Sequence, residues 1–385
     1  MESIFRSENI EAVSHNLALQ LKRSGDQPNL IVSFDVPGTE TRSFSGLKIY
    51  RDLFYLPLAQ LSHRWESLHI TLSRYRSVEF VQKYLTPHIE GYLPSLHSLR
   101  VDLMRAGEQD VFPIDAFKFA PVLRKLIINT PDVENFPFFL HLPWAQLTSY
   151  HGSTVRDIEP VARPRQVVRR MPNLETLFEE RMYVNETRPS LIRLDFLHTL
   201  ALVMTMPSGV DHNAISEYFD LLSLPRLRDL RLELKHYHWS QSMAAISRFF
   251  ARSTSTIRSL WLELDGAYEM SSLFIQVPHL DSLSLASVSA EVIDTLAEID
   301  LHRNQPRFLP QLCHLSMFSK ADAYYNPEDY MEESLIRFAK CRQNSTELVL
   351  DSFIKIRKES LDLMRAEGLH VRIENLAWAQ TFRAF

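Results

Sequence analysis

Residues 93–103 read LPSLHSLRVDL and residues 224–234 read LPRLRDLRLEL, so both follow the pattern L-P-x-L-x-x-L-x-L-x-L. Weaker copies of this phrase recur along the chain. We align them on the second anchor of L-x-x-L, which falls at Leu68, Leu99, Leu126, Tyr150, Leu177, Leu200, Leu230, Leu260, Leu283, Leu315, Leu348 and Leu369. A phrase that repeats every 20 to 50 residues or so is typical of a solenoid, in which each unit buries its apolar side on its neighbours.

The intervals between anchors run from 21 to 33 residues, with a mean of about 27. This mean is typical of leucine-rich repeats. We therefore predict an α/β fold, a curved leucine-rich-repeat solenoid with parallel strands on its concave face, helices on its convex face and irregular repeats. Residues 1–60 are expected to form an N-terminal cap with the first irregular repeats. Residues 61–385 would form the solenoid, in one continuous domain with residues 1–60.

Each copy of the phrase has the period of a strand that buries one side. In the copy at 230–235, leucines alternate with Arg231, Glu233 and Lys235, which places apolar and polar side chains on opposite faces. The intervening residues 212–222, 241–252 and 290–299 have apolar side chains at helical spacing. Prolines just ahead of the strands can end a helix without removing a sheet hydrogen bond; they are Pro94, Pro121, Pro172, Pro225, Pro278 and Pro310.

Composition and charge exclude several classes of protein. The net charge of −5 argues against general nucleic-acid binding, which normally requires a basic stripe. The longest apolar-looking run, residues 136–145, is interrupted by prolines and a histidine, so we expect no membrane association. The N-terminus lacks the pattern of a signal peptide, and two cysteines provide no disulfide framework. We expect a cytoplasmic or nuclear protein.

Two further segments carry a resemblance. Residues 23–34 read RSGDQPNLIVSF and residues 61–70 read LSHRWESLHI. With the L-P-x-L-x-x-L phrases that follow them, they resemble the repeat region of fungal F-box proteins with leucine-rich-repeat tails, from about Glu11 to the end of the chain. The resemblance implies that the repeats recognise a protein, as the substrate-recognition part of a ubiquitin-ligase receptor does.

The chain departs from that family at its start. An F-box is a helical segment that usually opens on a Leu-Pro-x-Glu-like phrase, and the 22 residues before Arg23 contain no such phrase. Either the gene model is truncated, or the chain is a repeat-only relative. A cullin-linker subunit would bind only if an F-box is supplied elsewhere. The alternative function is a stand-alone leucine-rich-repeat scaffold unrelated to ubiquitination.

The outward positions of the strands are the candidate partner-binding residues. Trp261 lies between two leucines and is expected to face outward, and exposed Trp and Arg are enriched in interface hot spots. In the other reading, its side of the sheet is covered or Trp261 packs on a loop. The charged positions either select a partner or form a solvated face of ion pairs. The set is Arg100, Asp102, Asn129, Arg231, Glu233, Trp261, Glu263, Phe318 and Arg372; His69, Ile127, Phe178 and His370 occupy equivalent positions.

If Trp261 is an exposed contact residue, Trp261→Ala should leave folding nearly intact and weaken partner capture. Leu262→Ala, by contrast, should cost roughly 2–5 kcal/mol as a core truncation. An effect of Trp261→Ala on folding would instead show that Trp261 belongs to the core.

Other clusters have a structural and a functional reading. Arg163, Arg165, Arg169 and Arg170 either form a basic patch or lie on the outer face of a helix. The acids at 328–333 either dock a partner or begin a helix, where they favour its dipole. His236 and His238 lack further ligands at a matching spacing, so we expect no metal. No hydrolase, nucleotide-binding or metalloprotease motif is present. We predict no enzyme activity and no cofactor.

Overall fold

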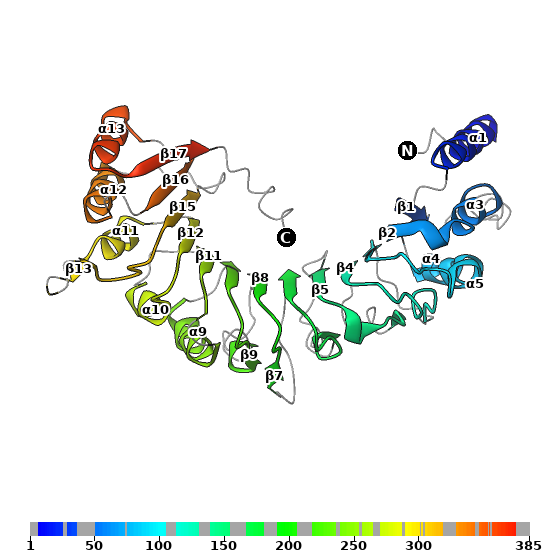
Figure 1. Ribbon diagram of the computed structural model, residues 1–385, viewed down its shortest axis with the longest axis horizontal. Coiled ribbons are helices and arrows are strands. Elements are labelled where there is room, and N and C mark those ends of the chain that lie inside the picture. Colours follow the sequence, from blue (N-terminus) through cyan, green and yellow to red (C-terminus); the bar gives the residue numbers. More distant parts are fainter. Residues whose placement is uncertain are drawn as a thin grey trace. The chain divides into compact units, whose positions relative to one another are not determined.

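The computed structural model describes residues 7–25, 29–36, 51–73, 75–104, 113–130, 139–154, 167–180, 191–205, 218–235, 239–253, 256–264, 270–286, 289–300, 302, 305–318, 329–342, 346–352, 354 and 356–374. The chain divides into two compact units, Met1–Glu180 and Arg181–Phe385. Both are mixed α/β. Within each unit the helices lie along one face of the strands (Figure 1).

The first unit contains six strands that pair side by side in sequence order, all parallel. They are β1 (Leu30–Val36), β2 (Trp65–Leu72), β3 (Ser98–Leu103), β4 (Lys125–Thr130), β5 (Ser149–Thr154) and β6 (Thr176–Glu180). The helices and helical turns are α1 (Ser7–Arg23), η2 (Arg51–Tyr55), α3 (Leu56–Ala59), η3 (Ser62–Arg64), α4 (Tyr75–Phe80), η4 (Val81–Leu85), α5 (Thr86–Ile89) and η5 (Trp144–Gln146).

The second unit contains seven further parallel strands. They are β8 (Thr199–Thr205), β10 (Asp229–Lys235), β11 (Ser259–Leu264), β12 (Ser282–Ala286), β15 (His314–Phe318), β16 (Glu347–Asp351) and β17 (His370–Glu374). Its helices are α9 (Trp239–Ser253), α10 (Ser271–Gln276), α11 (Ala290–Leu296), α12 (Asp329–Cys341) and α13 (Lys358–Ala366). Two small sheets pair β7 (Ile192–Arg193) with β9 (Leu222–Ser223) and β13 (Ile299–Asp300) with β14 (Gln305–Pro306). The predicted α/β class with parallel strands is confirmed.

The strand register follows the leucine anchors. Leu68 pairs with Leu99, Leu230 with Leu260 and Leu315 with Leu348, and the anchors between them within each unit pair in the same way. The last anchor is an exception, because Leu348 pairs with Val371 and not with the predicted Leu369. Leu369 and Val371 are both buried. In a strand of period two, residues two apart share a face, so alternation alone does not distinguish them.

The proline of each phrase lies at a constant place, four residues ahead of the strand. Pro94 precedes Ser98 of β3 by this spacing and Pro225 precedes Asp229 of β10, and the other four predicted prolines agree. The leucine two residues after each proline is almost completely buried; these leucines are Leu96, Leu123, Leu174, Leu227, Leu280 and Leu312. The turn into each strand therefore begins the apolar core between strands and helices.

Two helix predictions are confirmed and one is partly wrong. The predicted helix at 241–252 lies within α9, where Ala245, Ile246 and Phe249 are buried at helical spacing. The acids at 328–333 do begin a helix, since α12 starts at Asp329. The helix predicted at 290–299 ends at Leu296, and Ile299 is an exposed residue of β13. Of residues 212–222, positions 212–217 lie outside the described residues.

The end of α13 shows how a helix returns to a strand. Gly368 has φ of +90°, which favours glycine, and its N–H donates to Arg365 O at 3.0 Å. The next N–H, of Leu369, donates to Met364 O at 3.1 Å. This pair of bonds is a Schellman motif, which satisfies the last carbonyls of a helix and reverses the chain. It directs the chain into β17.

Candidate partner-binding face

Residues that alternate with the buried anchors form the face of each sheet opposite the helices, which we call the helix-distal face. In β3, Leu99, Val101 and Leu103 are buried, whereas Arg100 on the helix-distal face is exposed. The predicted binding residues all lie on this face. The structure places them in three different environments, one in the first unit and two in the second.

In the first unit, Asp102 is the centre of a hydrogen-bonded group that spans four adjacent strands. His69 Nε2 lies 2.7 Å from Asp102 Oδ2, and Asn129 Nδ2 donates to Asp102 Oδ1 at 2.6 Å. Arg100 Nε lies 3.0 Å from both carboxylate oxygens, and Ser33 Oγ lies 3.3 Å from His69 Nδ1. These five residues form the Asp102 network. It brings together the predicted Arg100, Asp102 and Asn129.

The network keeps Asp102 ionised. Burial opposes the charge of Asp102, but the hydrogen bonds from Arg100, His69 and Asn129 outweigh it and lower the pKa below its usual range. The side chain of Asp102 is only 13% exposed, whereas those of His69 and Arg100 are 34% and 46% exposed. The carboxylate is thus a fixed support under side chains that solvent and a partner can reach.

Ser33, His69 and Asp102 have the residue types of an acyl-transfer triad. In such a triad, the carboxylate orients a histidine that deprotonates the serine, and donors stabilise the resulting oxyanion. Here Asp102 also binds Arg100 and Asn129, which ties it into a row of side chains across the strands. The network is therefore a polar group held together across β1 to β4 on the helix-distal face.

Lys125 and His151 on β4 and β5 were not among the predicted residues. The His151 ring packs against that of Phe178 at a tilt, with ring centroids 4.0 Å apart. Burial lowers the pKa of His151 to about 4, and the charges of Arg100 and Lys125 act in the same direction. Lys125 directly precedes the anchor Leu126. That position also alternates onto the helix-distal face, so the strand period contained the signal for Lys125.

In the second unit, the expectation of an exposed face is wrong at five predicted residues. Trp261 is 8% exposed, Arg231 4%, and Glu233 and Glu263 1% or less. Trp261 packs with Ala286 and Phe318, the latter also buried, and the Arg231 guanidinium lies 3.9 Å from the centre of the Trp261 ring. Burial lowers the pKa of Arg231 to about 10, although the neighbouring Glu233 and Glu263 act in the opposite direction. The part of the helix-distal face around Trp261 therefore belongs to the buried core.

The reason for this error is that alternation identifies two faces without showing what covers each of them. Isolated burial of an ionised side chain is costly, so a run with Arg and Glu at alternate positions normally indicates a solvated face. In β10 and β11, Arg231 lies in register with Trp261, and the two carboxylates Glu233 and Glu263 lie in register with each other. Cation–π stacking and attraction between Arg231 and the carboxylates offset part of the desolvation.

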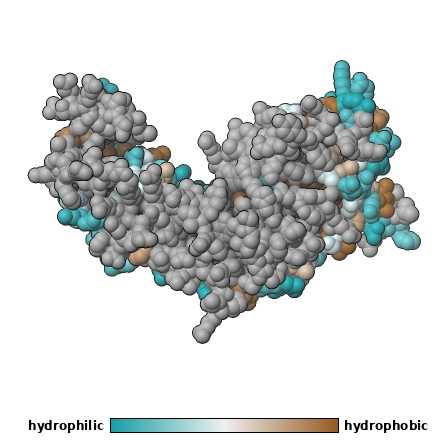
Figure 2. Space-filling model, turned by 180° about the vertical axis from the view of Figure 1, so that it is seen from behind, coloured by the Kyte–Doolittle hydropathy of each residue, from teal (hydrophilic) through white to brown (hydrophobic). Residues whose placement is uncertain are grey.

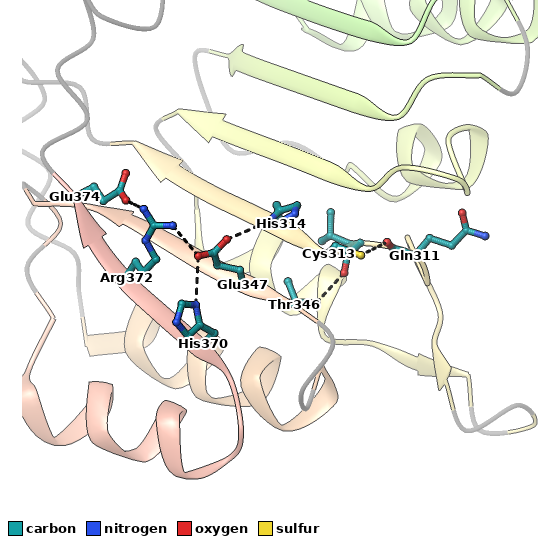
Figure 3. Close-up of polar contacts among 9 residues, drawn as sticks. Gln311, Cys313, His314, Thr346, Glu347, His370, Arg372 and Glu374 are labelled. Carbon is teal, nitrogen blue, oxygen red and sulfur yellow. Dashed lines mark hydrogen bonds and ion pairs between the residues drawn. The ribbon is translucent and has the colours of Figure 1, made fainter.

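At the C-terminal end of the second unit, the helix-distal face carries a group centred on Glu347 (Figure 3). The Glu347 carboxylate lies 3.1 Å from His314 Nδ1, 3.3 Å from His370 Nδ1 and 3.0 Å from a terminal nitrogen of Arg372. Arg372 also pairs with Glu374. These contacts, with that of Arg372 first, hold the pKa of Glu347 below its usual range despite some desolvation. Of this group, Arg372 was predicted as a binding residue and His370 as an equivalent outward position. Glu347 and His314 each directly precede an anchor leucine.

The remaining sequence candidates contribute little to either face. Arg169 and Arg170 are exposed beside the buried Val167 and Val168. Arg163, Arg165, His236 and His238 lie outside the described residues. Within the described ranges, no three His, Cys, Asp or Glu side chains are arranged to hold a metal ion.

Exposed apolar side chains are spread over the molecule. Those with large exposed areas come from distant elements and include Ile31, Tyr92, Phe119 and Ile275. In the view of Figure 2, the coloured residues alternate between hydrophilic and hydrophobic over short distances. Such scattered apolar residues are normal on a protein surface and do not mark an interface.

Comparisons with known proteins add no assignment. Neither protein-family models nor curated proteins give a match to this chain. Among the helices that the structure describes, none has the length and apolar character needed to cross a membrane.

Proposed function

We propose that this chain is a leucine-rich-repeat solenoid that binds a partner protein through the helix-distal face of its first unit. The observation that carries the proposal is the Asp102 network, in which Asp102 supports Arg100, His69 and Asn129 from neighbouring strands. Side chains held in place by their neighbours lose little conformational entropy when a partner binds, which favours affinity.

The proposed binding surface lies in the first unit, whereas the sequence had predicted Trp261, in the second unit, as a contact residue. Hot-spot residues must be accessible before binding and become desolvated in the complex. In the first unit Arg100 and His69 meet the first requirement, whereas Trp261 in the second unit is already buried. We therefore place the binding surface on β1 to β4.

The proposal extends to a role like that of the substrate-recognition part of an F-box receptor, with recognition alone carried out by this chain. Support for this extension comes from the resemblance of residues 23–34 and 61–70 to that family. The alternative is a stand-alone scaffold unrelated to ubiquitination. The two differ in whether a cullin-linker subunit accompanies the chain in its complexes.

The test compares the proteins that co-purify with three tagged forms of the chain from its own cells. The forms are wild type, a His69→Ala/Asn129→Ala double variant, and the control Glu79→Ala, which changes an exposed residue of α4. Removing two side chains from the proposed binding surface should weaken partner binding about tenfold or more, the loss typical of interface hot-spot residues. Circular dichroism establishes that each form is folded, and quantitative mass spectrometry measures recovery.

The binding function is supported if a protein is recovered with wild type and with Glu79→Ala but lost with the double variant. Equal recovery with all three forms would contradict it. Co-purification of a cullin-linker subunit supports the receptor role. A stable partner without that subunit supports the scaffold.

A further inference from the structure

The Arg100 side chain is held in place through one nitrogen, Nε, and its two terminal nitrogens are not used in that contact. Arg100 Nε is bound to both oxygens of Asp102, and the two terminal nitrogens have no partner among the described residues. Arg372 differs, because its terminal nitrogens bind Glu347 and Glu374. Arg231 differs too, because it is buried against Trp261.

A second cation lies next to Arg100 on the same face. Ser98 and Arg100 of β3 pair with Lys125 and Ile127 of β4, so Lys125 is the diagonal neighbour of Arg100. With a strand spacing of about 4.8 Å and a rise of about 3.3 Å per residue, such diagonal neighbours lie roughly 8 Å apart, within reach of two long side chains. Lys125 is half-buried, and its ammonium group has no ion-pair partner among the residues described. Arg100 lies in register with Ile127 and Ile127 with His151, and the charges of Arg100 and Lys125 both lower the pKa of His151.

We propose that Arg100 and Lys125 bind an oxyanion, a carboxylate or a phosphate, on the partner protein. This inference rests on the proposed protein-binding function and specifies the chemistry of its ligand. A guanidinium presents its donors as a planar fork that matches the two oxygens of a carboxylate or phosphate. Asp102 orients that fork before binding, and Lys125 adds a point charge from one side.

The surrounding charges favour an anion at this place. Asp102 is already matched by Arg100, His69 and Asn129, which leaves the charge of Lys125 unbalanced nearby. Among the described strand residues of the first unit, the other helix-distal carboxylates are Asp35, on a strand two positions from β3, and Glu180, three positions away. At about 4.8 Å per strand they lie roughly a Debye length or more from Arg100, so their repulsion is weak.

The test measures fluorescence anisotropy of labelled peptides added to the full chain at low and physiological salt. The probes are an octaglutamate peptide, the same peptide with one central phosphoserine, and an octalysine peptide. Wild type should bind both acidic peptides and not octalysine. Arg100→Gln and Lys125→Gln should each weaken that binding about tenfold, the typical loss for a charge-assisted hydrogen bond.

Arg100→Lys retains the positive charge but lacks the planar guanidinium. Its affinity for the acidic peptides should therefore lie between those of wild type and Arg100→Gln. The matched control is Arg124→Gln, an exposed residue directly before Lys125 that bonds to backbone carbonyls. It should bind as wild type does. If Arg100→Gln proves unfolded by circular dichroism, Lys125→Gln and Arg100→Lys decide the result.

Preference for the phosphoserine peptide, with displacement by inorganic phosphate, would support the site with a phosphate as its ligand. Equal binding of both acidic peptides would support it with a carboxylate. Absence of acidic-peptide binding, equal binding of octalysine, or binding unaffected by Arg100→Gln and Lys125→Gln would overturn it. The peptide test can contradict the oxyanion site while His69→Ala/Asn129→Ala still removes the co-purifying proteins. In that case the oxyanion site is wrong, and the protein-binding function remains supported.

Discussion

Trp261 shows how much a single side chain depends on what covers its strand. It lies between Leu260 and Leu262 on the helix-distal face, yet it packs against Ala286 and Phe318 and is almost fully buried. Trp261→Ala should therefore lower the free energy of unfolding by about 3–5 kcal/mol, as expected for removing a buried aromatic side chain. This reverses the expectation of nearly intact folding.

The matched control is Ser284→Ala, which changes the half-buried neighbour of Trp261 on β12. Urea unfolding of both variants measures the difference. An unfolding midpoint of Trp261→Ala equal to that of Ser284→Ala would show that the tryptophan contributes little to the core.

His151 makes the stability of the first unit sensitive to acid. Its folded pKa is lowered to about 4 by burial and by Arg100 and Lys125, whereas an unfolded histidine titrates near pH 6.5. Between these values the unfolded chain binds more protons, so stability falls as the pH drops from about 6.5 to 4. At pH 5 this amounts to about 2 kcal/mol.

Replacement of His151 by Asn removes this titration. Wild type and His151→Asn should therefore differ in how much stability they lose between pH 7 and pH 5, with the smaller loss in the variant. Chemical unfolding at the two pH values measures it. Parallel losses would show that His151 does not titrate as described.

At the scale of elements, Glu332 joins two helices of the second unit. This residue of α12 accepts the backbone N–H of Arg357 at 2.8 Å, Arg357 Nε at 2.7 Å and the Ser360 hydroxyl at 2.6 Å. Arg357 is the N-cap of α13, so Glu332 supplies the cap that the helix lacks from its own residues. Burial opposes the charge, but the Ser360 and Arg357 bonds prevail and lower the pKa of Glu332.

Glu332→Gln should lower stability by about 1.5–3 kcal/mol, the range for hydrogen bonds to a charged group, and speed amide exchange in α13. The adjacent Glu333→Gln is the control, because Glu333 is exposed and forms only a 3.9 Å pair with Arg337. Exposed pairs of that kind contribute about 0–1 kcal/mol. Equal effects of the two changes would contradict the capping role.

At the scale of the whole molecule, the parallel strands within each unit pair with the strands of neighbouring repeats. Stability in such an array is approximately a sum of local terms and nearest-neighbour interfaces. Leu262→Ala removes a buried residue of β11 and should cost about 2–5 kcal/mol. We expect amide exchange to accelerate most in β10, β11 and β12 and least in β1 to β3.

Hydrogen exchange with mass spectrometry measures this gradient, with Leu99→Ala in β3 as the reciprocal variant. Acceleration that is uniform over both units for either variant would show that the molecule unfolds as one cooperative body. Opposite gradients for the two variants would support the local arrangement.

Local periodicity was sufficient to predict most strands of the large parallel array, their parallel pairing and most of their register, but not the short strands β7, β9, β13 and β14. Apolar residues at period two, mostly leucines, identify the core face of the strands, and a proline four residues ahead marks the start of β3, β4, β6, β10, β12 and β15. Helix ends were harder to predict, since Ile299 fits the helical spacing but belongs to β13. At Val371 the same periodicity failed, because Leu369 is buried on the same face two residues earlier.

By itself, then, the sequence determined the repeat and the alternation of side chains between two faces, because both depend on residues near one another in the chain. Only the tertiary structure decided that Arg100, His69 and Asn129 meet at Asp102 while Arg231 and Trp261 are buried. The first outcome depends on register between strands about thirty residues apart. The second depends on which atoms cover the face, and no local pattern encodes such long-range contacts.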